Sequence, residues 1–136
     1  MYSHILIPVA LDHEGHFDTS LEAARRLLAD GGRLTLLNVV EDIPSYAQSY
    51  VPDGMMEQNA KAIDKAMSEL SDSAGDDCNY AIEHGKPSAA ILDYAEVNKA
   101  DCIVIASHKP GLGDFFIGST AARVVRHAKC NVHVLR

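Results

Sequence analysis

The sequence predicts a single α/β domain over residues 1–136, with an open, doubly wound sheet of five parallel strands and four helices. Short apolar runs alternate with segments whose apolar residues repeat at helical spacing. The runs are almost unbroken, as in strands that helices cover on both faces, and alternation at this spacing indicates right-handed crossovers. The chain is 47% hydrophobic, which is enough for a core in one domain of this length.

The first strand is expected at residues 5–10, an apolar run that contains Pro8. Because proline cannot donate a ladder hydrogen bond, Pro8 should lie near the end of this strand. Residues 19–22 read Thr-Ser-Leu-Glu and fit a capping box, so we predict that the first helix begins there. Asp30, followed by two glycines, should end it.

The second strand is expected at residues 34–40, and a long loop with two prolines and two tyrosines follows at 41–54. A long loop after a strand end is either a lid or interface segment, or an ordinary surface excursion. A long helix then spans about 55–73. Its apolar stripe, which is typical of core filling, consists of Met56, Ala60, Ile63, Met67 and Leu70.

The second half of the chain repeats the alternation. In order, we predict a weaker strand at 78–83, a helix introduced by residues 85–88, a strand at 102–106, a helix at 119–128 and a strand at 131–135. The last strand alternates apolar and polar residues and has no following helix to cover it. An uncovered edge of this kind is available to a second copy, so we predict a two-fold dimer through residues 132–135.

The expected strand order is 3-2-1-4-5, which places the switch point between the first and fourth strands. Ligands of open α/β sheets bind outside the carboxyl ends of the strands at such a point. There the residues 106–121 form a strand end, a polar loop with glycines and a helix start, in that order. Free N–H groups at a helix start attract anions, so this stretch is either a phosphate-binding loop or an ordinary turn.

Composition excludes several classes of function. The net charge of −7 disfavours nucleic-acid binding, which needs clustered lysine and arginine. A nucleotide would need local compensation from backbone N–H groups, from Lys109 or from His108. The three unpatterned cysteines indicate neither a disulfide framework nor a zinc site, and we find no Mg²⁺ ligand set, so no metal-ligating residues are assigned. No signal peptide or membrane-length apolar run is evident, so a cytoplasmic location is expected.

The motifs taken together resemble the universal stress proteins over essentially the full chain, and in particular the short bacterial subgroup often labelled F or G. The features that carry this resemblance are Ile5-Leu6-Ile7-Pro8-Val9, Leu36-Leu37-Asn38-Val39, Gly85-Lys86-Pro87, Ala106-Ser107-His108-Lys109-Pro110, Gly118-Ser119 and Val124-Val125-Arg126-His127-Ala128. The resemblance implies a cytoplasmic, usually dimeric protein, with a tetramer as a further possibility, related to the adenine nucleotide alpha hydrolase-like folds. It also implies that ATP, ADP or AMP binds, with Mg²⁺ as a candidate companion ion.

Carried over residue by residue, the resemblance places three groups of residues around the nucleotide. Adenine would lie against Pro8, Val9 and Val39, with Ala10 beside the ribose; the ribose and inner phosphates would lie against Ala106, Ser107, His108 and Lys109; and the distal phosphates would lie against Gly118, Ser119 and Thr120.

The chain departs from the pattern of ATP-binding members at three positions. Ala106 and Lys109 stand where those members have the two glycines of Gly-x-x-Gly, and Ala10 stands where many of them have aspartate. The resemblance therefore implies a nucleotide-binding stress-response module, with slow ATP hydrolysis or autophosphorylation at most. The alternative is a nucleotide-free interaction module of the same family. A two-component receiver or flavodoxin-like carrier shares the topology, but a receiver needs an acidic cluster where this chain has Pro8, Val9 and Ala10.

Overall fold

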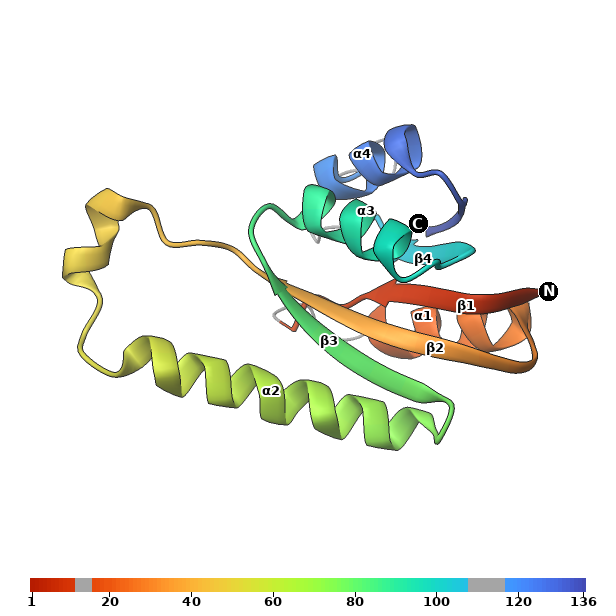
Figure 1. Ribbon diagram of the computed structural model, residues 1–136, viewed down its shortest axis with the longest axis horizontal. Coiled ribbons are helices and arrows are strands. Elements are labelled where there is room, and N and C mark those ends of the chain that lie inside the picture. Colours follow the sequence, from red (N-terminus) through yellow and green to blue (C-terminus); the bar gives the residue numbers. More distant parts are fainter. Residues whose placement is uncertain (12–15, 108–116) are drawn as a thin grey trace.

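The computed structural model describes residues 1–11, 16–107 and 117–136, and it contains one five-stranded parallel sheet in the order β3-β2-β1-β4-β5. This is the predicted order (Figure 1). The strands are β1 (Tyr2–Pro8), β2 (Leu28–Val40), β3 (Cys78–His84), β4 (Cys102–Ala106) and β5 (Asn131–Leu135). The described helices are α1 (His16–Leu27), α2 (Met55–Ala74), α3 (Pro87–Val97), α4 (Ser119–His127) and the short 3-10 helix η1 (Ser45–Tyr50).

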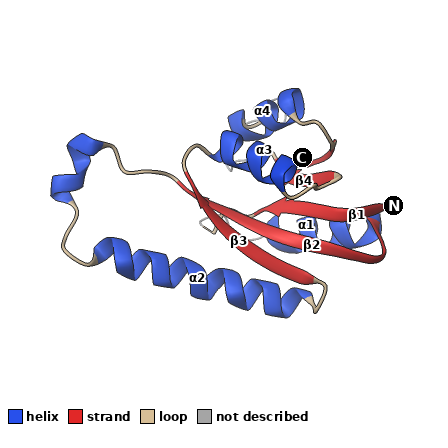
Figure 2. Cartoon of the chain, viewed as in Figure 1, coloured by secondary structure: helices blue, strands red, loops and turns tan. Residues whose placement is uncertain are grey.

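The sheet separates two apolar cores, because successive side chains of a strand point to opposite faces. On β1, Ile5 and Ile7 belong to a core that contains Ala24 of α1 and Met67 of α2. Leu6 belongs instead to the core that receives Ile91 and Ala95 of α3 and Val124 of α4. The sheet is therefore a middle layer between two helical layers (Figure 2), which is the doubly wound arrangement expected from the unbroken apolar runs.

The central pair of strands, β1 and β4, forms the switch point. Ile5 of β1 lies opposite Cys102 of β4. The helix that follows β1 packs on one face of the sheet, and the helix that follows β4 packs on the other. The chain therefore diverges to both sides beyond these two strand ends. The first strand was expected at 5–10 but spans Tyr2–Pro8. Pro8 lies at its end, in agreement with the prediction that it lies near the strand end, and Val9 and Ala10 lie just beyond the strand.

The predicted start of the first helix is wrong by three residues. The capping box at residues 19–22 lies inside α1, which begins at His16, and Ser20 of that box is buried. Phe17 packs against the same core as Leu21, one helical turn later, so apolar contacts extend the helix beyond the local capping signal. The predicted end of this helix at Asp30 is also wrong, because α1 ends at Leu27. The second strand, expected at 34–40, begins at Leu28, and Gly31 lies within it at φ +76°.

The core-filling interpretation of the stripe on α2 is correct for Met67, which is fully buried, and wrong for Met56, which is 59% exposed. A helix of 20 residues is about 30 Å long, and Figure 1 shows the first part of α2 extending beyond the sheet. The loop predicted at 41–54 leads into this part of the helix, and it contains η1.

The amino ends of the strands are held by a polar network that the sequence did not predict. The Asp101 carboxylate accepts hydrogen bonds from the backbone N–H groups of Ser3 and His4, both at 2.9 Å. The imidazole of His4 lies 2.8 Å from the Thr35 hydroxyl through Nε2 and 3.1 Å from the Asn98 carbonyl oxygen through Nδ1. Burial, with a smaller contribution from Arg33, lowers the pKa of His4.

The three cysteines are free, as expected from their spacing. Cys102 is buried in β4, and burial raises the pKa of its thiol to about 11. A neutral, enclosed thiol of this kind serves packing rather than nucleophilic chemistry.

Candidate functional site

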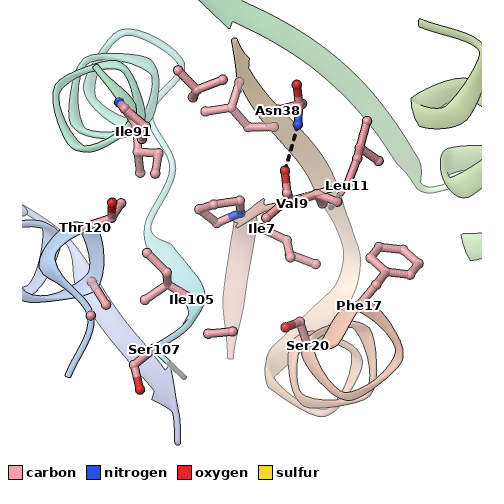
Figure 3. A pocket seen from close by; sticks show the side chains of 18 of the residues that line it. Ile7, Val9, Leu11, Phe17, Ser20, Asn38, Ile91, Ile105, Ser107 and Thr120 are labelled. Atoms are coloured by element: carbon pink, nitrogen blue, oxygen red, sulfur yellow. Dashed lines mark hydrogen bonds between the residues drawn. The ribbon is translucent and has the colours of Figure 1, made fainter. Parts of the chain in front are cut away.

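A cavity of about 560 Å³ opens at the carboxyl ends of the strands, at the switch point between β1 and β4 (Figure 3). Nine of the eleven residues predicted to contact a nucleotide line it: Pro8, Val9, Ala10, Val39, Ala106, Ser107, Gly118, Ser119 and Thr120. His108 and Lys109 lie outside the described residues. Residues from both halves of the chain therefore meet around one volume.

The β1 side of the cavity is fixed by two hydrogen bonds to Val9. Its backbone N–H donates to the Leu37 carbonyl oxygen at 2.8 Å, and its carbonyl oxygen accepts from Asn38 Nδ2 at 2.9 Å. Figure 3 shows the second bond. Asn38 is buried, so its side-chain amide bonds to the Val9 carbonyl oxygen and not to solvent. These two hydrogen bonds fix the position of the Val9 backbone in the cavity wall.

The β4 side is fixed by Ser107, the first residue beyond that strand. Its backbone N–H and its hydroxyl both donate to the Leu135 carbonyl oxygen, at 2.8 and 3.1 Å. Its carbonyl oxygen accepts from the Gly118 N–H at 3.1 Å, which closes the two ends of the loop on each other. A Cβ at Gly118 would lie 3.1 Å from that oxygen, so a glycine permits this close approach.

Helix α4 begins at the cavity without a side-chain cap. Gly118 is its N-cap residue and makes no side-chain hydrogen bond, and Ser119 and Thr120 form the first turn. The N–H groups of a first turn have no partners within the helix and carry partial positive charge. An anionic group in the cavity would meet these N–H groups together with two hydroxyls.

The remaining walls are apolar. Leu11, Phe17, Ile63 and Ile91 line the cavity from four different segments, and Figure 3 shows Phe17 and Ile91 on opposite sides of it. Glu41 is the one side chain with a formal charge among the described lining residues. The cavity therefore suits a flat or apolar body whose charge lies at the α4 end.

Sequence reasoning missed several of these lining residues for two reasons. Phe17 comes from the first turn of α1, which was predicted to begin later, and Ser20 was interpreted as part of a capping box. Ile63 comes from α2, and no local pattern relates it to the switch point. Asn38 was recognisable as a polar residue inside an apolar strand, which is the usual sign of a specific partner.

Comparison with known proteins gives the family. A model of the universal stress protein family matches residues 1–136. The chain belongs to that family. Universal stress protein A homolog 2 of Coxiella burnetii is 30% identical over 144 residues, which cover 99% of this chain and 95% of that protein.

Solved structures of the family share the fold. Universal stress protein UspA from Lactobacillus plantarum is 27% identical with a TM-score of 0.70, covering 99% of this chain and 98% of that one. A universal stress protein crystallised in complex with cAMP is 20% identical with a TM-score of 0.72, covering 99% and 97%.

Within residues 1–11, 16–107 and 117–136, no cluster of three or more histidine, cysteine, aspartate or glutamate side chains is arranged to hold a metal ion. None of the helices in these segments has the length and apolar character that a membrane span requires.

Proposed function

We propose that this universal stress protein binds an adenine nucleotide in the switch-point cavity and acts as a cytoplasmic, homodimeric stress-response module. The observation that carries the proposal is the convergence of Pro8, Val39 and Gly118, from three distant segments, on one cavity. Its volume of about 560 Å³ lies within the range of small-molecule sites. The relative with cAMP bound has the same fold, which supports this choice of ligand class.

In this proposal the base lies between the apolar walls near Pro8, Val9 and Val39. The ribose lies beside Ala10, Ala106 and Ser107. The phosphates meet the first turn of α4 at Gly118, Ser119 and Thr120, together with His108 and Lys109. ATP, ADP and AMP all satisfy this arrangement, with Mg²⁺ as a companion ion for the longer phosphate chains.

Turnover in this site is slow at most. Phosphoryl transfer needs a positioned nucleophile and neutralisation of the phosphate charge. Glu41 is the sole carboxylate among the described lining residues, and no positively charged side chain joins it there. We therefore propose a binding module in which hydrolysis or autophosphorylation, at Ser119 or Thr120, is incidental.

The dimer would form through β5. This strand pairs with β4 along one edge, and no other strand of the described sheet pairs with its second edge. His133 is exposed in the middle of β5. The substitution His133→Asp places like charges across the two-fold axis and should reduce the mass in sedimentation equilibrium from two chains to one. Asn79→Asp, on the opposite edge strand β3, is the matched control and should leave the mass unchanged.

The nucleotide is tested by denaturing the purified protein without added ligand and identifying released compounds by mass spectrometry. The expected result is ATP, ADP or AMP at about one per chain. In nucleotide-free protein, saturating ATP should raise the melting temperature by roughly 4 °C or more. Ala106→Leu, which fills part of the cavity, should abolish the rise, whereas Ala89→Leu on the exposed side of α3 should not. No released nucleotide and no rise would overturn the assignment.

A nucleotide-free interaction module is the second candidate. It is favoured by Ala10, a methyl group beside the proposed ribose position, and by Glu41, which opposes an anionic ligand. In that case ATP leaves the melting temperature unchanged, while the β5 variant His133→Asp still alters the mass. The melting temperature with ATP therefore distinguishes the candidates, because the change in mass is expected under both.

A further inference from the structure

The segment between β2 and the packed part of α2 stands away from the rest of the chain. We define this arm as residues 41–60, which hold η1 and the first six residues of α2. Figure 1 shows the arm, in yellow, projecting beyond the carboxyl ends of the strands. Every residue from 52 to 62 is exposed, on all sides of the helix as well as in the turn before it.

The arm exposes large apolar side chains that a helix normally buries. Tyr46 and Tyr50 are 81% and 85% exposed, and Met55 and Met56 are 42% and 59% exposed. Half of the large apolar side chains that the described chain exposes thus lie within eleven residues. Met56 and Ala60 continue the stripe that packs into the core from Ile63 onward. A stripe that continues past its own core indicates a second surface to be covered.

The charge of the arm narrows the choice of partner. Residues 41–60 contain four carboxylates, Glu41, Asp42, Asp53 and Glu57, and no lysine or arginine. All four are exposed. An acidic surface repels nucleic acid and anionic membranes. The partner that fits is a protein surface that combines positive charge with exposed apolar groups.

This chain itself presents such a surface on α4. Residues 117–136 contain four lysines and arginines and no acidic residue. Arg123 and Arg126 are exposed one helical turn apart, and neither forms an ion pair within the described residues. Between them Val125 is 47% exposed, and Ile117 just before the helix is 38% exposed. The two surfaces are therefore complementary in charge and alike in apolar content.

The two surfaces cannot meet within one chain as it is folded. Figure 1 shows the arm at the left end of the molecule and α4 at the upper right, beyond α3 as seen from the sheet. We propose that the arm of one copy docks on the α4 surface of a second copy, in a contact distinct from the β5 edge. Aromatic and methionine side chains are enriched in interface cores, and charge complementarity sets the register and rate of such contacts.

The test is a charge swap in the full-length protein, made in the His133→Asp background so that pairing through β5 does not contribute. One variant reverses the arm (Asp53→Lys, Glu57→Lys), a second reverses α4 (Arg123→Glu, Arg126→Glu), and a third carries all four changes. The control Asp72→Lys with Asp76→Lys makes the same change in net charge as the arm reversal, at exposed positions in the last turn of α2 and just beyond it. Association is measured by sedimentation equilibrium at about 0.02 M and about 0.5 M salt.

The expected result is association at low salt that weakens at high salt, because the contact pairs opposite charges near solvent. Each reversal should lower the association constant about tenfold or more, since like charges then face each other. The four-fold variant should restore it to within about threefold, and the control should match the background. Absence of association at low salt, failure of the swap to restore it, or loss of it in the control would each overturn the proposal. Because nucleotide is not required, this outcome is independent of the proposed ligand.

Discussion

The two ends of the sheet use their polar groups in opposite ways. At the amino end, His4, Thr35 and Asp101 are bonded to one another or to the backbone of neighbouring segments. At the carboxyl end, helix α4 begins with no side-chain cap and faces a cavity. Internal hydrogen bonds hold the backbone at both ends, but only at the carboxyl end does a helix start without a side-chain cap face a cavity in which a ligand is proposed to bind. The difference separates residues that hold the fold from residues that offer a site.

The largest expected effect lies at the amino end, in Asp101→Ala. The variant removes a carboxylate that accepts from two backbone N–H groups, and bonds to a charged group contribute about 1.5–3 kcal/mol each. We expect the free energy of unfolding in urea to fall by about 3 kcal/mol, with no change in ligand affinity.

The control for this variant is Asp93→Ala, at an exposed position of α3 whose side chain forms no hydrogen bond or ion pair with the described residues at either end of the sheet. It should change stability by less than about 0.5 kcal/mol. Equal losses in the two variants would mean that the amino-end network does not stabilise the fold.

The order of strands and most element bounds were predictable because buried parallel strands leave unbroken apolar runs. The strands 102–106 and 131–135 were predicted with the bounds that the structure has. The start of α1 was not, since the capping box at 19–22 is a local signal and the contact of Phe17 with the core is not. Periodicity showed that α2 has an apolar face, but it gave no information on how far the sheet reaches beneath it.

The candidate site was predictable where topology decides it. Pro8 and Gly118 follow from the strand order, because the ends of neighbouring parallel strands share one edge of the sheet. Ile63 and Phe17 reach the cavity through the packing of whole helices, which one sequence does not reveal. The bond between Asn38 and Val9 likewise depends on a register that only the folded sheet defines.

Two variants with similar expected losses of stability test the contrast between the two ends of the sheet directly. Asn38→Ala removes the hydrogen bond to Val9 at the cavity, and Thr35→Val removes the hydroxyl that contacts His4 at the other end. Each should lower the free energy of unfolding by about 1–2 kcal/mol. Only Asn38→Ala should also weaken nucleotide binding, by roughly fivefold, because it releases the wall of the cavity. Urea unfolding measures the first effect and calorimetric titration with nucleotide measures the second, and weaker binding in Thr35→Val would contradict the proposed separation.

The pH dependence of stability should come partly from His4. Burial, and then Arg33, lowers its pKa from the ordinary 6.5, although the Asn98 carbonyl and Asp101 act in the opposite direction. The unfolded chain therefore binds a proton near pH 6.5 while the folded chain stays neutral, so stability falls as pH drops below about 6.5 until the folded pKa is reached.

The variant His4→Gln should lose less stability than the wild type between pH 7 and 5, because glutamine does not titrate. Ala89→Gln, which places the same uncharged side chain at an exposed position of α3, is the control and should keep the wild-type slope. Urea unfolding at several pH values gives these slopes. Identical slopes in His4→Gln and the wild type would mean that His4 does not contribute to the pH dependence of stability.

The smallest expected effect lies at the carboxyl end, in Ser119→Ala. Its hydroxyl is one of several donors at the start of α4, and each contact between an anion and a helix start contributes about 0.3–2 kcal/mol. We expect nucleotide affinity to fall about two- to fivefold, with an unchanged melting temperature, since no other part of the described chain depends on this side chain. Ser88→Ala, in the first turn of neighbouring α3 but outside the cavity lining, should leave affinity unchanged. A loss of stability in Ser119→Ala would mean that this residue holds the fold, and the contrast between the two ends of the sheet would then fail at the position where it is most specific.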